Sequence, residues 1–361
     1  MVQSRITMTS ERSCSRRTPE ERSAIDCAQP VKIDVDSSIF GSQGDPLEYP
    51  GLMPDRPYLV QGDVAQPLEW RDGKLLLSSS GEGVDSVLTG LGLETLGERT
   101  AQVAYGANRD LRNLAWKMIA YARAQQASSV TVVLPGSLQD SDVVACNLGY
   151  WGYIYSSLIQ HRPPLLDRPY LKGSSVQAAI LLLDNQQVAA MHASEGVPAT
   201  AGEQRASLSC DVATTHCEVA CVGAQITAQT YVLALPYLSL DGGSRPVGMA
   251  AVAKRGAEAF PRLSEVDLWE RIAEALQIPD FRSVVSGLRS AALSRALGDP
   301  GVNPEVQQAY ERIRLSLADD FPLVDPDGVA RDGIDGCSTL LSYEDAWAGL
   351  PTLGSQGVNL G

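Results

Sequence analysis

The feature that most constrains the fold is a strand, a tight turn and a helix in direct succession, beginning at residue 101. Ala101–Tyr105 predict a short apolar strand, and Gly106–Arg109 predict a tight turn. A helix is expected from Asp110 to Gln125, with Asn108 or Asp110 as its N-cap. One face of that helix gathers apolar residues at helical spacing: Leu111, Leu114, Ala115, Met118, Ile119 and Ala122. The sequence therefore predicts a mixed α/β centre that starts here.

Further elements continue this centre and then give way to helices. Strands are expected at 130–134, 142–148, 152–158, 175–183, 218–222, 228–234 and 246–253, and a short helix at 186–193. The segment 175–183 is apolar over most of its length, which is typical of a strand buried on both faces. Beyond residue 260 a capping-box-like start at Ser264 opens a helical pattern, with more helices near 281–297 and 303–318.

The composition along the chain predicts four segments. Residues 1–45 are rich in Ser, Arg, Glu, Asp and Gln with few large apolar side chains, so they predict a disordered N-terminal leader. Residues 46–100 carry Pro and Gly every few positions, which indicates a loop-rich entry segment with a hairpin or two. Residues 101–258 are the expected α/β domain, and residues 259–361 the expected helical C-terminal extension.

The charge and the hydropathy of the chain narrow the class of partner. A formal net charge of −14, spread along the sequence, argues against nucleic acid or an anionic membrane surface and favours a small molecule. No stretch approaches the roughly 18 apolar residues that a membrane-spanning helix needs, and the first residues lack an apolar signal region. We therefore expect a cytoplasmic protein. The seven cysteines are an odd number and are scattered, which favours reduced thiols.

The second informative segment is Met191–Ala199, which places one carboxylate between a helical stretch and a turn containing Gly196 and Pro198. Glu195 is the candidate catalytic residue, because a glutamate held in an apolar cleft can accept and return a proton near neutral pH. In the loop Tyr105–Asn108, glycine permits close backbone approach, and the first helical N–H groups can donate to an anion or a carbonyl. Each segment also has a plain structural interpretation, as a solvated helix end and as a simple turn.

Both segments, in this order and at this separation, resemble the gamma-glutamylcyclotransferase-like family. Its members carry a Tyr-Gly-Ser-Asn loop near the start of the domain, and an Asp- or His-x-x-Glu-Gly segment that supplies the catalytic glutamate. Tyr105–Asn108 match the first motif, and His192–Gly196 resemble the second. The order of the intervening elements also fits, and the resemblance covers roughly residues 101–255.

The resemblance implies an α+β fold in which a small, closed or nearly closed mixed β-barrel has flanking helices. It also implies a reaction, in which the free α-amine of a γ-glutamyl group attacks its own γ-carbonyl and releases 5-oxoproline and an amine. Glu195 would carry the proton, and Tyr105, Gly106, Ala107 and Asn108 would hold the substrate. No metal and no organic cofactor is implied. The expected partner is a small molecule with a γ-glutamyl or similar amide.

Some features depart from the family. Ala107 stands where its members have serine, and the leader, an insertion after Ala199 and the C-terminal helices are not explained by small cyclotransferases. Two other interpretations therefore stay open: a non-catalytic small-molecule-binding protein on the same fold, and an amidohydrolase that uses water. The identity of the amine and the oligomeric state are left open as well.

Two side-chain clusters complete the candidates. Tyr150, Trp151, Tyr153 and Tyr155 form an aromatic group that either packs in the core or lines a pocket, and Tyr153 joins the candidate substrate contacts. Cys210, Cys217 and Cys221 with His216 could be assembled into a zinc site, but their spacing fits no closed structural pattern well.

Overall fold

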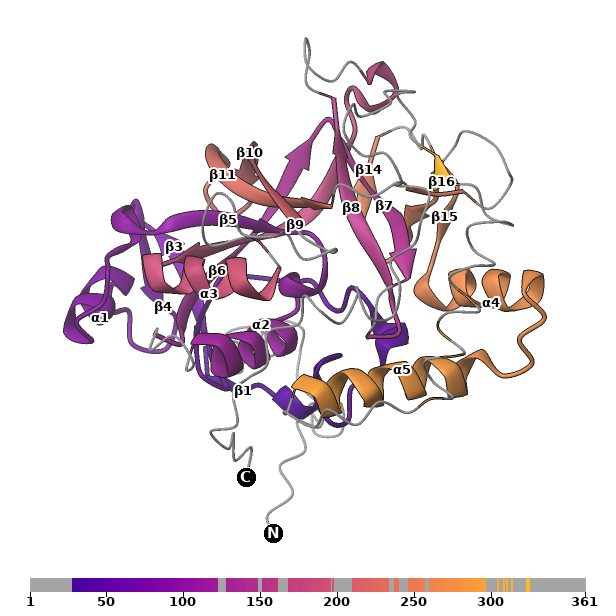
Figure 1. The fold of residues 1–361 in the computed structure, drawn as a ribbon. Helices are drawn as coiled ribbons and strands as arrows, with labels where there is room; N and C mark the ends of the chain where they lie inside the picture. The colour runs from indigo at the N-terminus through magenta and orange to yellow at the C-terminus, as the bar shows by residue number, and fades with distance from the viewer. Residues whose placement is uncertain are drawn as a thin grey trace, which may run out of the picture.

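The computed structural model describes residues 28–122, 128–148, 151–161, 168–195, 197, 210–233, 237–239, 246–256 and 260–296, with 304, 308, 310, 313, 323 and 324. Residues 1–27 of the expected leader, most of the insertion after Ala199 and the end of the chain lie outside these ranges. Within them the protein is a mixed α+β structure, with large and mostly antiparallel sheets and five α-helices (Figure 1).

The strands and helices follow one another along the described chain. The strands are β1 Val31–Lys32, β2 Tyr58–Gln61, β3 Val64–Arg71, β4 Lys74–Leu77, β5 Thr100–Ala104, β6 Val130–Gln139, β7 Ser141–Leu148, β8 Ile154–Gln160, β9 Ser175–Leu183, β10 Cys210–Val219, β11 Ala224–Leu233, β12 Tyr237–Leu238, β13 Gly248–Met249, β14 Lys254–Arg255, β15 Arg262–Leu263 and β16 Leu323–Val324. The helices are α1 Val84–Gly90, α2 Leu111–Lys117, α3 Asn185–Ser194, α4 Glu265–Ala275 and α5 Phe281–Ala296. Short 3-10 turns add to these, and a π-helical turn, Met118–Ala122, continues α2.

The main sheet has a pairing pattern that returns on itself. Its strand order is β1-β3-β2-β6-β10-β11-β5-β9-β14, and β6 pairs with β9 as well. The five strands β6, β10, β11, β5 and β9 therefore form a closed circuit of pairings, in which only β5 and β11 run parallel. A second sheet, in the order β15-β13-β7-β8, lies beside this circuit (Figure 1).

Strand β9 sits at the centre of the core, as its apolar sequence predicted. It pairs with β5 on one edge and with β6 on the other, and Ala178, Ala179, Ile180 and Leu181 are all fully buried. Burial of successive residues means that both faces of the strand are covered. Helix α3 packs against the π-helical turn that continues α2, below this part of the sheet, and Leu114 and Met191 are also buried there (Figure 1).

The boundary predicted for the disordered leader, residue 45, lies too far along the chain. Residues 31–32 pair with β3, and Ile33, Ile39 and Phe40 are buried in the main core. The large apolar residues of this stretch are few, but Ile33, Ile39 and Phe40 pack among elements that come later in the chain. Composition averaged over a segment cannot detect such isolated anchors.

Residues 46–100 are also more regular than expected. They contribute β2, β3, β4 and α1, and β2 pairs directly with β6 of the main sheet. The frequent glycines mark turns between short elements, for example Gly62 and Gly73 at positive φ. This segment is thus part of the same core as the expected α/β domain.

Several predicted boundaries move. The strand expected at 218–222 is wrong, because β10 ends at Val219 and Cys221–Gly223 form the turn to β11. Of the strand expected at 246–253 only Gly248–Met249 is extended, followed by a turn. The first helix changes to π geometry at Met118, and its predicted end lies outside the described residues.

The C-terminal extension is helical over α4 and α5, as predicted. Ser264 caps α4 by accepting from the backbone N–H of Asp267, which completes the expected capping box. The apolar faces of both helices are buried, with Leu268, Trp269 and Leu288 in the main core. No helix in the described ranges is long and apolar enough to cross a membrane.

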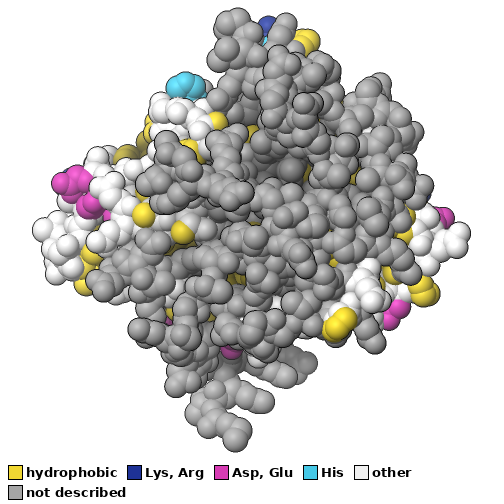
Figure 2. Space-filling model, viewed as in Figure 1, with side chains coloured by type: hydrophobic (Ala, Val, Ile, Leu, Met, Phe, Trp, Pro, Cys, Tyr) yellow, Lys and Arg dark blue, Asp and Glu magenta, His cyan; other side chains and the backbone are white. Residues whose placement is uncertain are grey.

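The described part of the surface has isolated hydrophobic side chains. Figure 2 shows them singly among polar groups on one face. The large exposed ones come from distant elements: Val31, Leu52, Trp70, Leu91, Tyr170, Val212 and Val222. Single exposed apolar residues are normal for a folded protein and mark no site.

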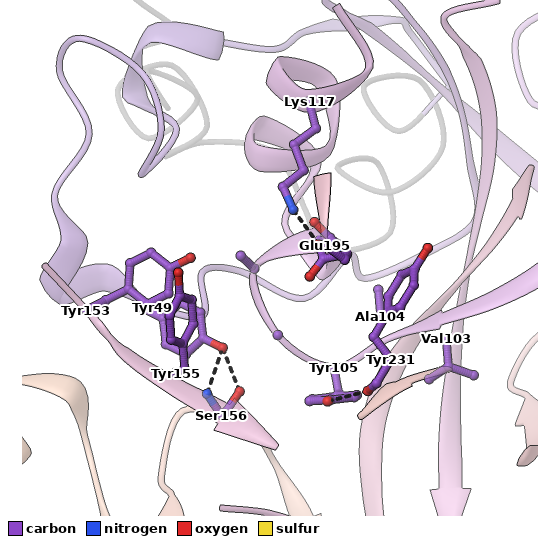
Figure 3. A pocket seen from close by; sticks show the side chains of 13 residues that line it. Tyr49, Val103, Ala104, Tyr105, Lys117, Tyr153, Tyr155, Ser156, Glu195 and Tyr231 are labelled. Carbon is purple, nitrogen blue, oxygen red and sulfur yellow. Dashed lines mark hydrogen bonds and ion pairs between the residues drawn. The ribbon is translucent and has the colours of Figure 1, made fainter. Parts of the chain in front are cut away.

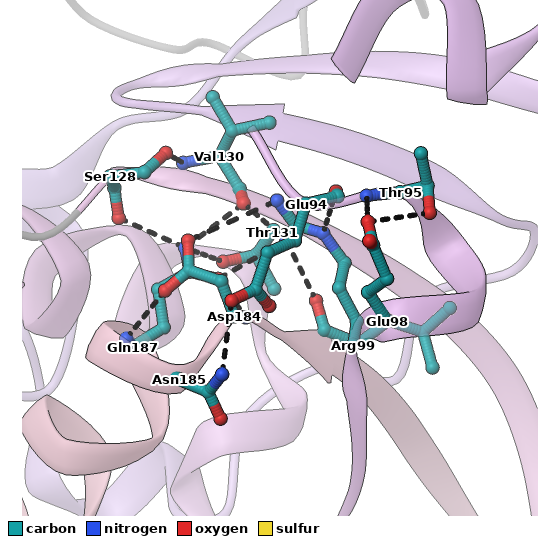
Figure 4. A network of polar contacts seen from close by, with 11 residues as sticks. Glu94, Thr95, Glu98, Arg99, Ser128, Val130, Thr131, Asp184, Asn185 and Gln187 are labelled. Carbon is teal, nitrogen blue, oxygen red and sulfur yellow. Dashed lines mark hydrogen bonds and ion pairs between the residues drawn. The ribbon is translucent and has the colours of Figure 1, made fainter. Parts of the chain in front are cut away.

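A buried polar network fixes the start of α3 (Figure 4). Arg99 donates to the carbonyls of Val130 and Leu182 and to Oε1 of Gln187, at 2.9, 3.2 and 3.2 Å. The Asp184 carboxylate accepts from the backbone N–H of Gln187 at 2.7 Å, and Oε1 of Gln187 accepts from the backbone N–H of Asp184 at 3.0 Å. The network joins β6, β9 and α3, so it sets the position from which α3 starts.

We predict that Arg99→Met lowers the free energy of unfolding by about 2–4 kcal/mol, because it removes the hydrogen bonds of the buried Arg99 side chain and the cation nearest the buried carboxylate of Asp184. Urea denaturation measures the effect. Arg71→Met is the matched control, since the Arg71 side chain is 58% exposed and its pairing with Glu69 is a surface contact. The control should change stability by less than about 0.5 kcal/mol. Equal effects of the two substitutions would contradict the role assigned to the network.

Candidate functional site

Glu195 occupies a fixed position at the end of α3. The helix starts at the Asp184 cap and runs for ten residues. The backbone N–H of Glu195 donates to the carbonyls of Met191 and His192, both at 3.1 Å. Gly196 and Pro198, which the sequence placed in the following turn, lie outside the described residues. The carboxyl group is thus carried by the last turn of a helix whose start is anchored in the core.

The loop Tyr105–Asn108 follows β5 directly and passes into a 3-10 turn, Ala107–Arg109, before α2. Asn113 holds this turn by donating to the carbonyl of Ala107 at 3.0 Å. The buried Arg109 side chain donates to the carbonyls of Gly51 and Ala251, both at 2.8 Å. The sequence predicted a tight bend here, and its anchors come from distant parts of the chain.

The structure brings Glu195 and this loop together. Nδ2 of Asn108 donates to Oε1 of Glu195 at 2.9 Å, across 87 positions of sequence. Both line one cavity of about 70 Å³ (Figure 3). Tyr105, Gly106, Ala107 and Tyr153 line the same cavity, so all of the predicted site residues lie at one pocket. Oδ1 of Asn108 is buried and has no hydrogen-bond partner within the described part of the chain.

A lysine that was not among the predicted site residues, Lys117, also reaches the pocket. Nζ of Lys117 lies 2.5 Å from Oε1 of Glu195, and the two side chains are 9% and 19% exposed. The same ammonium lies 5.2 Å from the centre of the Phe40 ring. The environment of Glu195 is therefore an ion pair and an amide, and the expected apolar cleft is not what surrounds it. Figure 3 shows Lys117 extending from its helix toward Glu195.

Aromatic side chains form the opposite wall of the pocket (Figure 3). The rings of Tyr153 and Tyr49 stack with centroids 4.4 Å apart, and the hydroxyl of Tyr49 lies 2.6 Å from Oγ of Ser156. Burial raises the pKa of Tyr49 above its ordinary value. A Cβ at position 106 would come within 3.0 Å of the Tyr49 hydroxyl, so Gly106 lets the loop approach this wall closely.

Tyr231 closes the remaining side. Its hydroxyl lies 2.7 Å from Nδ1 of His192, and its backbone carbonyl accepts from the hydroxyl of Tyr105 at 2.6 Å. Burial lowers the pKa of His192, although the nearby charge of Glu195 opposes that shift. His192 thus holds the side chain of Tyr231, which lines the pocket.

Four lining residues with polar side chains escaped the sequence analysis: Tyr49, Lys117, Ser156 and Tyr231. One of them had a signal. Lys117 is the only charged residue in the run Leu114–Ala122 and sits three positions after Leu114, on the apolar side of the predicted helix. A charge in that position needs a buried partner. The others come from segments whose approach to the loop depends on the tertiary fold.

The alternative zinc arrangement is not supported by the strand geometry. His216 is exposed and Cys217 buried on β10, because successive residues of a strand face opposite sides. The described residues contain no group of three or more His, Cys, Asp and Glu side chains suited to a metal ion. The side chain of Cys210 lies outside the described part.

No protein-family model matches the sequence, and no curated protein matches it. A solved structure with some similarity is that of the uncharacterized protein loc79017 from Homo sapiens. It is 15% identical, the similarity covers 38% of this chain and 67% of that chain, and the TM-score is 0.25. A likeness of this size carries no functional argument.

We predict that protonation of His192 weakens the fold in mild acid. Because burial lowers its pKa below the ordinary 6.5, the unfolded chain takes up the proton more readily than the folded chain. This contribution to stability is present above pH 6.5 and is lost as the pH falls through the lower folded pKa. His192→Gln should flatten that part of the curve of unfolding free energy against pH. His216→Gln, at an exposed position, should leave it unchanged. Identical curves for wild type and His192→Gln would rule out this linkage.

Proposed function

We propose that the protein is a gamma-glutamylcyclotransferase-like enzyme, which releases 5-oxoproline and an amine from a γ-glutamyl amine or related amide. The observation that carries the proposal is the contact between Glu195 and Asn108 at a shared pocket. These residues belong to the two motifs that resemble the family, and they are 87 positions apart in the sequence. A shared pocket is what a joint catalytic role requires, whereas a simple turn and a solvated helix end would have no reason to meet.

The strand pairings support the same proposal. The resemblance implies a small barrel, and the closed circuit of β6, β10, β11, β5 and β9 is the pairing pattern expected of one. The loop and the catalytic carboxylate would then stand at one end of that barrel, with the C-terminal helices packed outside it. We infer the barrel from this circuit.

In the proposed reaction the α-amine nitrogen of the substrate forms a bond to the γ-carbonyl carbon. Glu195 takes one proton from the substrate ammonium to free the attacking amine and returns it to the departing nitrogen as the original amide bond breaks. The second proton that the ring nitrogen loses passes to the released amine, which leaves as an ammonium. One C–N bond forms and one breaks, and no water is consumed. The unpartnered Oδ1 of Asn108 offers an acceptor that would help to orient the substrate ammonium.

The carbonyl oxygen gains negative charge during this attack and needs donors. The first N–H groups of a helical turn have no partner within that turn, so the backbone at Gly106, Ala107 and Asn108 suits this task. Ala107 lacks the hydroxyl that the family has at this position. The Tyr49 and Ser156 hydroxyls lie against Gly106 and would supply polar contacts on the same side of the pocket.

A non-catalytic binding protein is the second candidate, and one observation favours it. Oε1 of Glu195 already accepts from both Lys117 and Asn108. A carboxylate with these two partners is well placed to recognise a cation without ever exchanging a proton. Binding and turnover therefore have to be measured separately.

We predict that Glu195→Gln abolishes 5-oxoproline release from γ-glutamyl amines, because an amide cannot act as the proton carrier. The loss should exceed about a hundredfold in kcat, as expected for removal of a general acid-base group. Mass spectrometry of the products measures it. Glu69→Gln, on the exposed part of β3, is the matched control and should keep full activity.

The product distinguishes the rival functions. Free glutamate carrying oxygen from heavy-oxygen water would identify an amidohydrolase, since cyclisation incorporates no water oxygen. Calorimetric binding of γ-glutamyl amines by the wild type without any product would identify a binding protein. Turnover that is unchanged in Glu195→Gln would remove the catalytic assignment.

A further inference from the structure

Lys117 is a charged side chain in a place where charge is costly. It is only 9% exposed, and Glu195 is its single hydrogen-bond acceptor among the residues that the structure describes. A buried ammonium is stable only when it is paired, and its three hydrogens can serve three acceptors. The pocket thus contains an ammonium with more N–H donors than the described residues supply acceptors for.

The position of Lys117 makes this capacity available to a ligand. The side chain lines the same cavity as Glu195, Asn108 and the loop (Figure 3). The ring of Phe40 lies against the ammonium on another side, and an aromatic face tolerates a cation without accepting its hydrogen bonds fully. The remaining N–H donors of Lys117 can therefore bind an acceptor that enters the pocket.

We propose that Lys117 determines substrate specificity by binding the free α-carboxylate of the ligand, so that the Glu195–Lys117 pair receives an α-amino acid headgroup. This inference rests on the proposed function and names the substrate class for it. The ligand ammonium pairs with Glu195, and the ligand carboxylate pairs with Lys117.

Charge balance gives the reason for selectivity. Within the protein the two charges neutralise each other at 2.5 Å. A ligand that carries both an ammonium and a carboxylate can separate them and still leave every charge paired. A ligand whose carboxyl group is an amide brings only the ammonium, so the buried lysine would lose its share of Glu195 without compensation.

The assignment also divides the work in the pocket. The loop backbone is a candidate for holding either the substrate carboxylate or the carbonyl oxygen. If Lys117 takes the carboxylate, the N–H groups at Gly106, Ala107 and Asn108 remain for the carbonyl oxygen, where charge develops in the reaction. Lys117 then acts on binding, and Glu195 on proton transfer.

The test compares two matched ligands, γ-glutamyl methylamide and the same compound with its α-carboxyl group converted to a carboxamide. Both keep the α-amine and differ by one charge. Calorimetry on the Glu195→Gln protein, which cannot turn the ligands over, should give tighter binding of the carboxylate form by about tenfold or more. Adding Lys117→Met should remove that preference, and adding Lys117→Arg should retain most of it. Lys74→Met, at an exposed position on β4, should leave it intact.

Turnover provides a second reading of the same preference. In the otherwise wild-type protein, Lys117→Met should raise KM for the carboxylate substrate, and it should lower KM for the carboxamide or leave it unchanged, because the cost of an unpaired lysine is removed. Circular dichroism and thermal melting verify that the Met variant is folded, and if it is not, Lys117→Gln replaces it. Equal binding ratios with and without Lys117 overturn the inference, as does the absence of binding of both ligands. A Lys117-dependent preference without any 5-oxoproline supports the inference and rejects the proposed catalytic function.

Discussion

The pairing of β5 with β9 is the constraint on which the pocket depends. Thr100 faces Leu183 and Ala104 faces Ala179, so the end of β5 that carries the loop is remote from the end of β9 that leads into α3. Helix α3 has to run back along β5 to bring its last residue to the loop. Its ten residues rise about 15 Å, close to the roughly 14 Å that β5 covers. Helix length and strand length therefore match, and Glu195 arrives beside Asn108.

A second support comes from residues 28–52. Oδ1 of Asn113 accepts from Ser38 Oγ and the backbone N–H of Ile39, at 2.9 and 3.0 Å, while its Nδ2 holds the loop. The same region supplies Phe40 beneath Lys117 and Tyr49 in the pocket wall. Removing this region would therefore remove part of the site itself. The sequence could not predict that residues 28–52 help to build the pocket. Single residues make these contacts, and their partners lie about 70 to 110 positions later in the sequence.

What the sequence predicted well is what local pattern determines. The apolar run of β9, the short helix α3, the capped start of α4 and the bend after β5 each depend on neighbouring residues, and all four are present. The strand expected at 218–222 failed for a physical reason. The preceding residues of β10 alternate between exposed polar and buried positions, with Thr214 and His216 outside and Thr215 and Cys217 inside, so they carry no apolar run. Pairing with β6 and β11 keeps them extended in spite of that.

The buried ion cluster around Asp142 shows how the Glu195–Lys117 pair at the pocket differs from charges that serve the fold. Asp142 is fully buried and binds Lys254 and Arg262 at 2.6 and 2.7 Å, and Arg262 also donates to the carbonyls of Met249 and Val252. Lys254 lies on β14 and Arg262 on β15, so the cluster joins the two sheets, and none of its three charged residues lines the pocket that holds Glu195. The Asp142 carboxylate therefore has its two cations within the protein and serves the fold.

The Glu195–Lys117 pair lacks these features. Among the described residues it has one cation for one carboxylate, and neither the remaining donors of Lys117 nor Oδ1 of Asn108 has a partner there. A cavity adjoins both side chains. A pair built only for stability would be better replaced by apolar side chains, since desolvating two charges offsets most of their attraction. At the edge of a cavity, both charges of the pair can also contact a ligand. A ligand that carries an ammonium and a carboxylate would offset the desolvation cost of the pair, and this is the reason for the substrate class that we propose.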